Sequence, residues 1–423
     1  MREVQIAFLG LGNVGSGVYK ILQMRKKEFE EKEDLRINIK RILVRNINKK
    51  RAVEVDRNIL TDNPDDILND PEISIVAEFI GGEKPALEYL LKALNSGKTV
   101  VTANKEVIAR HWEKLDEAAK ASGAGLYYEA SVCGGIPVIK AIQESLQANR
   151  IERIMGIING TTNYILTKMS ENNERFEEAL RKAQELGYAE PDPTADIEGY
   201  DAAFKLSILS TLCFHKRVHL DNILREGITN ITLEDISYGR ELGYALKLLA
   251  IAKDNDGKVE ARVHPTFIPL NHPLSSVRSS FNAVYLKGDC FGDMMFFGRG
   301  AGDLPTGSAV VSDILTACGR KEHRYMDFGK KTADAVYNDD WKTKYYVRLT
   351  VKDQPGVLAE IAGYFGKYQV SIASVIQKGY GDTTAPLIFV THEASEKSIQ
   401  KAIAEIRESK YVISVDNLIR VEE

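Results

Sequence analysis

The segment from residue 187 to 206 concentrates charged side chains that could bind a cation or move a proton. Its sequence, GYAEPDPTADIEGYDAAFKL, contains five carboxylates and one lysine. They are Glu190, Asp192, Asp196, Glu198, Asp201 and Lys205. Asp201 and Lys205 are four residues apart, so on a helix their side chains share one face. An amine in this position can donate a proton to a reacting oxygen or stabilise a developing alkoxide.

The spacing of Asp201 and Lys205 also has a simpler explanation. On an exposed helix the two would form an ordinary ion pair, worth about 0.3–0.5 kcal/mol. A neighbouring carboxylate also raises the pKa of a lysine, whereas a proton donor near neutral pH needs a lower one. A substrate ammonium group that engages Asp201, or a second lysine such as Lys105 that repels Lys205, would relieve this conflict.

A glycine-rich turn near the amino terminus predicts a dinucleotide site. The turn consists of Gly10, Leu11, Gly12, Asn13, Val14 and Gly15. It fits GxGxxG and directly follows the apolar run VQIAFL. In such a turn the first glycine allows the tight turn, the second lets the backbone approach a pyrophosphate, and the third packs the helix on the strand. The alternative is a glycine turn kept for packing alone.

The residues after the second predicted strand bear on the choice of cofactor. An acidic residue there would bond the ribose 2′-hydroxyl of NAD. This chain has Arg45 instead, followed by Lys49, Lys50 and Arg51. A guanidinium group suits the 2′-phosphate of NADP, so the sequence favours NADP, with NAD as the alternative. The basic residues could also be a solvated turn.

The surrounding sequence predicts an α/β protein in three parts. Strands alternate with helices over residues 1–135, which predicts a Rossmann-type NAD(P)-binding domain, completed by a helix within about 300–330. Residues 136–300 are less regular and are interpreted as an α+β catalytic and dimerisation domain. After a linker at 331–344, residues 345–423 follow the pattern β-α-β-β-α-β, which is typical of a ferredoxin-like module.

Six segments, in order along the chain, resemble homoserine dehydrogenase across the catalytic region. They are GLGNVG, TANKE at 102–106, EASVCGGIPVI at 129–139, NGTTNYIL at 159–166, the acidic segment at 187–206 and GRGAGDLPTGSAVVSD. The DQPGVL turn at 353–358 resembles that of an ACT domain. The resemblance implies reversible NAD(P)H-dependent reduction of L-aspartate 4-semialdehyde to L-homoserine, in the biosynthesis of threonine, methionine and isoleucine.

The resemblance also implies roles for individual residues. Lys205 matches the family's proposed proton donor, and Lys105 matches a second lysine beside the nicotinamide and the reacting oxygen. Glu190 and Asp201 match carboxylates that bind the substrate, and Asp196 is expected to orient its neighbours. Additional cofactor contacts are implied for Lys105, Gly187 and Gly302.

The segment EASVCGGIPV resembles the part of the family that binds a monovalent cation, usually Na+. Glu129 and the backbone carbonyls of Val132, Gly134 and Ile136 match the ligands, and oxygen ligands suit a hard cation. We expect the metal to be structural. The alternative is a tight Gly-Gly-Ile-Pro turn ahead of a helix.

The ACT resemblance implies an amino-acid effector, with threonine expected. Asp353, Gln354 and Gly356 are the candidate contacts. The alternative is a pairing module that binds nothing. Both this module and the middle domain resemble pairing units, so a homodimer or homotetramer is expected.

Composition limits the other classes of function. The formal net charge of −4 gives no general attraction to nucleic acid or an anionic membrane, and no apolar run reaches the roughly 20 residues that a membrane span needs. The four cysteines are scattered, which favours a reducing, cytoplasmic compartment. Two other functions are alternatives: a different amino-acid-aldehyde oxidoreductase, and a non-catalytic amino-acid sensor, which would not need two lysines beside the acidic segment.

Overall fold

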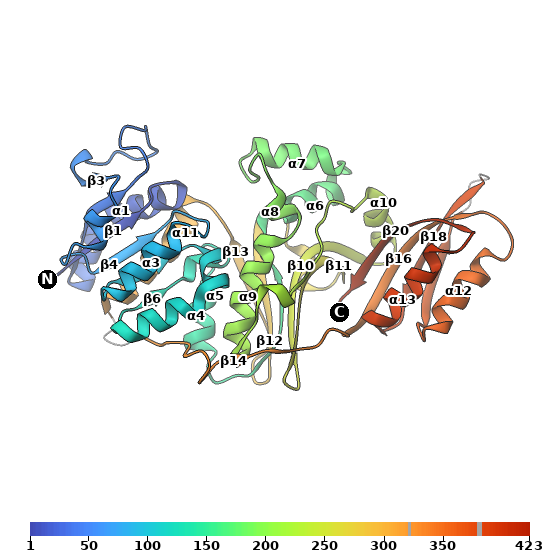
Figure 1. Cartoon of the computed structure of the whole chain (residues 1–423). Helices are drawn as coiled ribbons and strands as arrows, with labels where there is room; N and C mark the ends of the chain where they lie inside the picture. Colours follow the sequence, from blue (N-terminus) through green and yellow to red (C-terminus); the bar gives the residue numbers. More distant parts are fainter. Residues whose placement is uncertain (320–322, 379–382) are drawn as a thin grey trace.

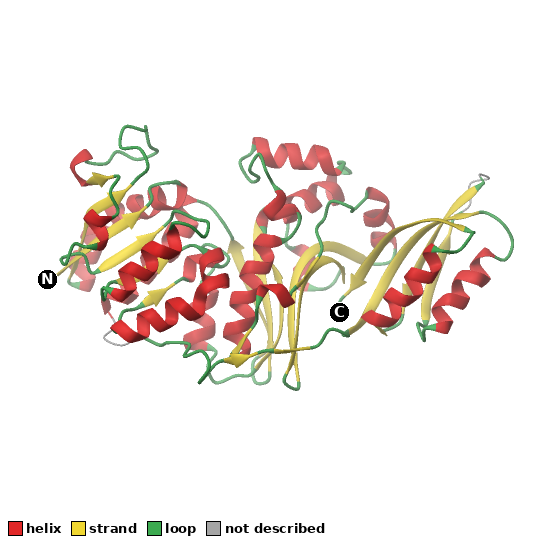
Figure 2. Cartoon of the chain, viewed as in Figure 1, coloured by secondary structure: helices red, strands yellow, loops and turns green. Residues whose placement is uncertain are grey.

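The computed structural model describes residues 1–319, 323–378 and 383–423 and arranges them as three parts in a row (Figure 1). An amino-terminal α/β domain comes first, a mixed central sheet with its helices follows, and the carboxyl-terminal module lies at the far end. Figure 2 shows that helices flank the amino-terminal sheet and lie beside the central one. No helix in the described ranges is long and apolar enough to cross a bilayer.

The amino-terminal sheet is parallel, with strand order β3-β2-β1-β4-β5-β6. Its strands are β1 (Arg2–Leu9), β2 (Leu35–Leu43), β3 (Leu60–Thr61), β4 (Ile75–Glu78), β5 (Thr99–Thr102) and β6 (Leu126–Tyr127). Strands β2 and β3 are added on one side of β1, and β4, β5 and β6 on the other, so the order of the strands reverses between β1 and β4. Doubly wound sheets bind dinucleotides at this switch point. The predicted α/β fold class is confirmed.

Helices cover both faces of this sheet. They are α1 (Asn13–Glu33), the short α2 (Asp65–Leu68), α3 (Ala86–Asn95), α4 (Lys105–Ser122) and α11 (Asp303–Gly319). Alternate residues of β1 face opposite sides, as a strand requires. Ile6 and Phe8 belong to the core cluster with residues of α1 and α11, whereas Ala7 and Leu9 belong to the cluster with residues of α3 and α4. The late helix α11 therefore packs against the first domain.

Two glycines allow α1 and α11 to cross closely. A Cβ added to Gly17 would lie 2.0 Å from the carbonyl oxygen of Asp303, and one added to Gly307 would lie 2.9 Å from the backbone of Gly17. Both positions are helical and buried, so the need for glycine arises from the close approach of two backbones.

We expect Gly17→Ala to lower stability by about 1–3 kcal/mol, the usual cost of overpacking a close contact. The measurement is the thermal unfolding midpoint. Gly363→Ala is the matched control, because Gly363 is also helical but an added Cβ there meets nothing within 4 Å. It should keep or raise the midpoint. Equal midpoints for the two variants would contradict the crossing described above.

The central part is built on a mixed sheet. Its main strands are β7 (Ile151–Ile157), β10 (Tyr244–Asn255), β11 (Lys258–Pro269), β12 (Phe281–Gly288) and β13 (Gly292–Arg299). Its helices are α5 (Val138–Lys140), continued by a π turn (Ala141–Ser145), then α6 (Gly160–Asn172), α7 (Phe176–Glu185), α8 (Thr194–Ile197), α9 (Tyr200–Phe214) and α10 (Leu233–Glu241). Helix α9 packs on this sheet and on α4 of the first domain, so it joins the two parts.

The carboxyl-terminal module has the predicted order of elements. They are β16 (Lys342–Lys352), α12 (Val357–Lys367), β17 (Ile372–Gln377), β18 (Thr384–Thr391), the short β19 (Ala394–Ser395), α13 (Glu396–Arg407) and β20 (Val412–Val421). The end predicted for the third of these elements, at residue 379, lies outside the described residues.

The module is not separate from the central part. The end of β20 pairs with β11, at Thr266↔Arg420 and Phe267↔Val421, so that within the described residues one sheet of twelve strands runs through both. The segment interpreted as a linker also lies against the central part, because β14 (Ala333–Asp334) pairs with β8 (Lys216–Arg217) and β15 (Val336–Tyr337) pairs with β11.

Candidate active site

The glycine turn after β1 lies where the strand order reverses, and part of its backbone is not covered by other residues. Gly10 has φ of 107°, which favours glycine, and an added Cβ on Gly15 would lie 2.9 Å from the Gly10 carbonyl oxygen. At Gly12 an added Cβ would meet nothing within 4 Å, and Gly12 and Asn13 are exposed. Val14 is half-buried in the first turn of α1. An open backbone at a helix amino terminus is the arrangement that binds a pyrophosphate.

Arg45 follows the end of β2 and is exposed. Its guanidinium group makes no hydrogen bond or ion pair with a residue that the structure describes. Arg51 differs, because it donates to the backbone oxygens of Asn46, Ile47 and Lys49 and so closes its own loop. Arg45 is therefore the free guanidinium group beside the carboxyl end of β2.

Lys105 is the first residue of α4, and a buried network fixes it there. Asn104 caps the helix by accepting from the Val107 N–H at 3.2 Å, and its amide donates to the Gly82 carbonyl at 2.8 Å. The buried Glu78 accepts from Thr102 Oγ1 at 2.6 Å. Burial raises the pKa of Glu78. This network ties the loop after β4 to the start of α4, and sequence reasoning assigned no role to its members.

Asp201 joins the two predicted lysines. Its Oδ2 lies 2.6 Å from Lys205 Nζ, and its Oδ1 lies 3.0 Å from Lys105 Nζ. Lys205 Nζ also donates to the Ile158 carbonyl at 2.8 Å. Asp201 and Lys205 are buried, whereas the Lys105 side chain is 40% exposed. The arrangement is not the exposed ion pair that the spacing alone allowed, and the two lysines do converge.

Asn159 holds the acidic side of the cluster together, and sequence reasoning missed its role. It caps α6 at the end of β7, where its Oδ1 accepts from the Thr162 N–H at 2.8 Å. Its amide nitrogen donates to Asp196 Oδ1 at 2.7 Å and to Asp201 Oδ2 at 2.9 Å. One amide therefore separates and orients two carboxylates.

The charges of the cluster depend on one another. Burial alone would raise the pKa of Asp201, but the ammonium groups of Lys205 and Lys105 hold it well below its usual value. The Asp201 carboxylate in turn raises the pKa of Lys105. Burial, and then the neighbouring Asp201 charge, raises the pKa of Asp196. Asp201 is therefore ionised at neutral pH and serves both amines.

Comparison with known proteins places the chain in a family. Family models described as the NAD-binding domain of homoserine dehydrogenase, homoserine dehydrogenase and the ACT domain match residues 10–129, 137–315 and 345–410. The homoserine dehydrogenase of Bacillus subtilis is 40% identical, over 100% of this chain and 99% of that protein. The chain belongs to the homoserine dehydrogenase family.

Two further relatives agree over nearly the whole length. The homoserine dehydrogenase of Synechocystis is 42% identical, over 99% of both chains. A crystal structure of a homoserine dehydrogenase from Thiobacillus denitrificans is 40% identical, with a TM-score of 0.93 over 100% of this chain and 99% of that one. The predicted assignment to an NAD(P)-dependent oxidoreductase of amino-acid biosynthesis, with an ACT domain, is confirmed.

Three predicted site residues lie outside the contacts of the cluster formed by Lys105, Asn159, Asp196, Asp201 and Lys205. Glu190 is exposed, and its carboxylate makes no hydrogen bond or ion pair within the described ranges. Gly187 is exposed and has φ of 74° at the end of α7, where an added Cβ meets nothing. Gly302 has φ of 126° just before α11, near Pro305.

The residues expected to bind a cation form a buried turn. The Glu129 carboxylate accepts from the N–H groups of Ile139 at 2.9 Å and Lys140 at 2.7 Å, so it caps the start of α5. Burial raises the pKa of Glu129 to about 7. The Ile136 carbonyl accepts from the Val138 N–H at 2.8 Å. The buried carbonyls of Val132 and Gly134, in contrast, accept no hydrogen bond from the described residues.

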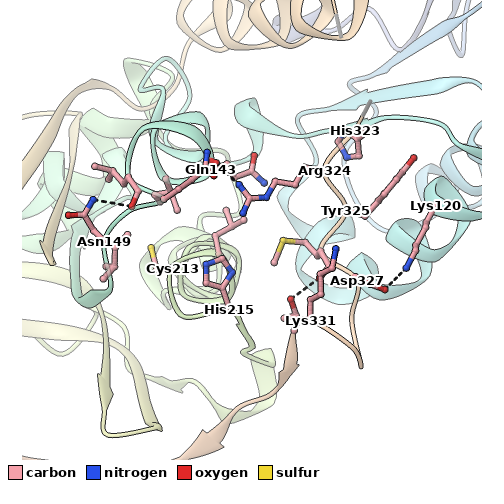
Figure 3. Close-up of a pocket in the computed structure, with 17 residues that line it drawn as sticks. Lys120, Gln143, Asn149, Cys213, His215, His323, Arg324, Tyr325, Asp327 and Lys331 are labelled. Carbon is pink, nitrogen blue, oxygen red and sulfur yellow. Dashed lines mark hydrogen bonds and ion pairs between the residues drawn. The ribbon is translucent and has the colours of Figure 1, made fainter. Parts of the chain in front are cut away.

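A separate cavity of about 540 Å³ lies at the other end of α4 and α9. Figure 3 shows His215, Arg324 and Lys331 around it, with the contact between Lys120 and Asp327 at one side. Lys105, Asp201 and Lys205 do not line it. The cluster around Asp201 is therefore not part of this cavity.

Proposed function

We propose that this chain catalyses the reversible transfer of hydride between NAD(P)H and L-aspartate 4-semialdehyde, with L-homoserine as the product. The observation that carries the proposal is the bridge of Lys105 and Lys205 by the two oxygens of Asp201. The bridge lies where α4, which follows β5 of the Rossmann sheet, meets α9 of the central part.

The amines supply the proton that aldehyde reduction requires. Bound NAD(P)H supplies the hydride to the carbonyl carbon. Lys205 Nζ donates a proton to the carbonyl oxygen, and the Lys105 ammonium group stabilises the negative charge that develops there. In the reverse direction, neutral Lys205 removes the proton from the alcohol.

The acidic segment holds the substrate by its ammonium group. Asp201 and Glu190 are the proposed ligands, and Asp196, fixed through Asn159, keeps Asp201 in place. When the substrate ammonium group also contacts the Asp201 carboxylate, that carboxylate interacts less strongly with Lys205. Proton donation by Lys205 is then favoured. The pyrophosphate of the cofactor is assigned to the turn of Gly10, Gly12, Asn13, Val14 and Gly15. The further proposed contacts of the cofactor are Lys105, Gly187 and Gly302.

The direct test follows NAD(P)H absorbance with L-homoserine and each oxidised cofactor in turn. We expect reduction of the cofactor that depends on homoserine, and no turnover with alcohols that lack the α-amino group. Equal turnover of such alcohols would point to a different oxidoreductase. Amino-acid binding without any turnover would point to a sensor.

NADP is the proposed cofactor, because Arg45 is free beside the turn. A hyperthermophilic archaeal homoserine dehydrogenase in complex with NADPH supports this preference; it is 26% identical, with a TM-score of 0.64 over 75% of this chain. We expect Arg45→Gln to raise KM for NADPH by about tenfold, one lost charge-assisted contact, and to leave KM for NADH almost unchanged. Steady-state kinetics with both cofactors provide the measurement, and Arg51→Gln is the control. An equal effect on both cofactors would show that Arg45 does not contact the phosphate.

We also propose a monovalent cation, Na+, at the turn of residues 129–136. The free carbonyls of Val132 and Gly134 fit such an ion, and Ile136 keeps a second lone pair. Because both Glu129 carboxylate oxygens already accept N–H groups, Glu129 would act chiefly by fixing the turn. The role is structural.

Threonine is the proposed effector of the ACT module. Asp353, Gln354 and Gly356 form an exposed turn before α12, where Asp353 Oδ1 lies 3.5 Å from Gln377 Nε2. Pairing of this module and of the central part with those of other copies of the chain would give a homodimer or homotetramer. The proposed location is the cytoplasm. The oligomeric state in solution, with and without threonine, tests both parts of this proposal.

A further inference from the structure

The two helices that carry the proposed catalytic groups lie against each other. Lys105 begins α4, and Asp201 and Lys205 lie in the first two turns of α9. The helices pack together and are side by side in Figure 1. The ion pair of Lys105 with Asp201 joins them at one end, but the Lys105 side chain is 40% exposed, and ion pairs open to solvent contribute little stability. Contacts deeper between the helices therefore decide their separation.

A buried guanidinium group provides such a contact. Arg217 belongs to the short strand β8 and is 3% exposed. On the α4 side, its Nη2 donates to the Ala109 carbonyl at 2.6 Å, and its Nε donates to Glu113 Oε1 at 2.7 Å. On the α9 side, its Nη1 donates to Ser207 Oγ at 3.4 Å. One side chain therefore bonds both helices.

The bonds to α4 lie where that helix is irregular. His111 has φ of −131° and ψ of 20°, which are not helical, and it lies between Ala109 and Glu113 in the chain. A side chain that inserts into the hydrogen-bond ladder of a helix is one of the common causes of a kink. Arg217 binds the carbonyl before the kink and the carboxylate after it, so it stabilises the bend. The bend sets the direction of the first turns of α4 and hence the position of Lys105.

The side of Arg217 that faces α9 is fixed by further hydrogen bonds. Ser207 is fully buried, two residues after Lys205, and its Oγ donates to the Val218 carbonyl at 2.6 Å. Arg217 Nη1 donates to the same carbonyl at 3.3 Å. The backbone of β8 is held by β14, and the Ala335 N–H donates to the Arg217 carbonyl at 3.0 Å. The guanidinium group is therefore held from several sides and can act as a rigid link.

We propose that Arg217 is a positioning residue for the reaction: it holds α4 and α9 at the separation at which Asp201 meets Lys105. No hydrogen bond or ion pair in the described chain links Arg217 to Lys105, Asp201 or Lys205, so it acts through the two helices. The inference rests on the proposed function, because it takes Lys105 and Asp201 to be groups of the active site.

Arg217→Lys is the direct test, because it keeps the charge and removes the planar fork of donors. A lysine ammonium group is a single point of charge at the end of a flexible stem. It cannot bond the Ala109 carbonyl, Glu113 and Ser207 together. We therefore expect the two helices to shift relative to each other, and the contact between Lys105 and Asp201 to loosen.

The first measurement is the titration of Lys105 and needs no turnover. Competitive labelling of the full-length chain with acetic anhydride at a series of pH values, read by mass spectrometry, gives the titration midpoint of this amine. The Asp201 charge is the main cause of the raised pKa of Lys105, and Asp196 and Glu106 contribute less. A looser contact with Asp201 should therefore lower the midpoint in Arg217→Lys.

The second measurement is the rate of aldehyde reduction. We expect kcat to fall by about 10–100-fold in Arg217→Lys, since misplacement of a reacting group by about 1 Å costs about 10²-fold. KM for NADPH should hardly change, because Arg217 makes no hydrogen bond to the glycine turn in the part of the chain that the structure describes. A loss of folded protein alone would not separate kcat from KM in this way.

Arg420→Lys is the matched control. Arg420 is 1% exposed and also joins separate parts of the chain, through Glu396 at 2.6 Å and Glu226 at 2.8 Å. Its described hydrogen bonds reach neither α4 nor α9. Arg420→Lys should lower the unfolding midpoint and leave both kcat and the titration midpoint of Lys105 unchanged.

A milder variant keeps the inference testable where Arg217→Lys does not fold. The Glu113 side chain is 43% exposed, so Glu113→Gln removes the ionic partner of Arg217 without emptying the core. It should lower the Lys105 midpoint by a smaller amount and then decides in place of Arg217→Lys. An unchanged Lys105 midpoint in the deciding variant, or an equal fall in Arg420→Lys, would overturn the inference. Absence of homoserine turnover in the unaltered chain would overturn the proposed function instead, and the labelling would still decide the role of Arg217.

Discussion

Lys205→Met is expected to lower kcat for aldehyde reduction by about 10²–10⁴-fold, the usual contribution of a positioned proton donor. NADPH affinity should hardly change, because Lys205 Nζ is held by Asp201 Oδ2 and the Ile158 carbonyl and not by the glycine turn. Methionine keeps most of the apolar stem of the side chain. The measurements are kcat under saturating substrate and the Kd of NADPH by fluorescence.

A second buried lysine provides the control for this variant. Lys247 is 6% exposed and donates to the Val277 carbonyl at 2.6 Å, and no hydrogen bond or ion pair in the described chain links it to Lys105, Asp201 or Lys205. Lys247→Met should lower the unfolding midpoint and leave kcat near its original value. If Lys205→Met kept a near-normal rate, Lys205 would not be the proton donor. If the two variants lost activity equally, the loss would reflect folding.

The amino-terminal domain could be predicted because each of its signals is local. The apolar run of β1, the glycines of the turn and the alternation of helices with strands lie within short windows. The long β10–β11 hairpin was missed, although Asp256-Gly257, with φ of 49° and 94°, is a hairpin-turn signal. The junction of β20 with β11 had no such signal, since it joins residues about 150 apart.

The spacing of Asp201 and Lys205 could be found because charge at i,i+4 is visible in a sequence, whereas Lys105, far away along the chain, was implied only by the family resemblance of the TANKE segment. The role of Asn159 could not, because its three hydrogen-bond partners come from separate turns of the folded chain. The same holds for the carbonyls of Val132 and Gly134, which are only proposed as cation ligands, since every residue has a carbonyl group. Gly17 and Gly307 became informative only once the crossing of α1 and α11 was known.

Asp201→Asn should have the other large effect. One uncharged side chain would replace the counter-ion of two ammonium groups, and its NH2 group would face one of them as a second donor. We expect kcat to fall by about 10²-fold, since misplacement of a reacting group by about 1 Å has this cost. KM for homoserine should rise as well, because the substrate ammonium group loses its carboxylate.

The pH profile separates this role from simple structural damage. The Asp201 charge raises the pKa of Lys105, so its removal lets that pKa fall. Aldehyde reduction needs protonated amines, so the basic limb of kcat/KM should move to lower pH in Asp201→Asn. Asp196→Asn is the matched control, because it removes a carboxylate that shares Asn159 but forms no ion pair with either lysine in the described chain. Its basic limb should move much less. A loss of rate in Asp201→Asn with an unmoved basic limb would contradict the electrostatic link between Asp201 and the two lysines.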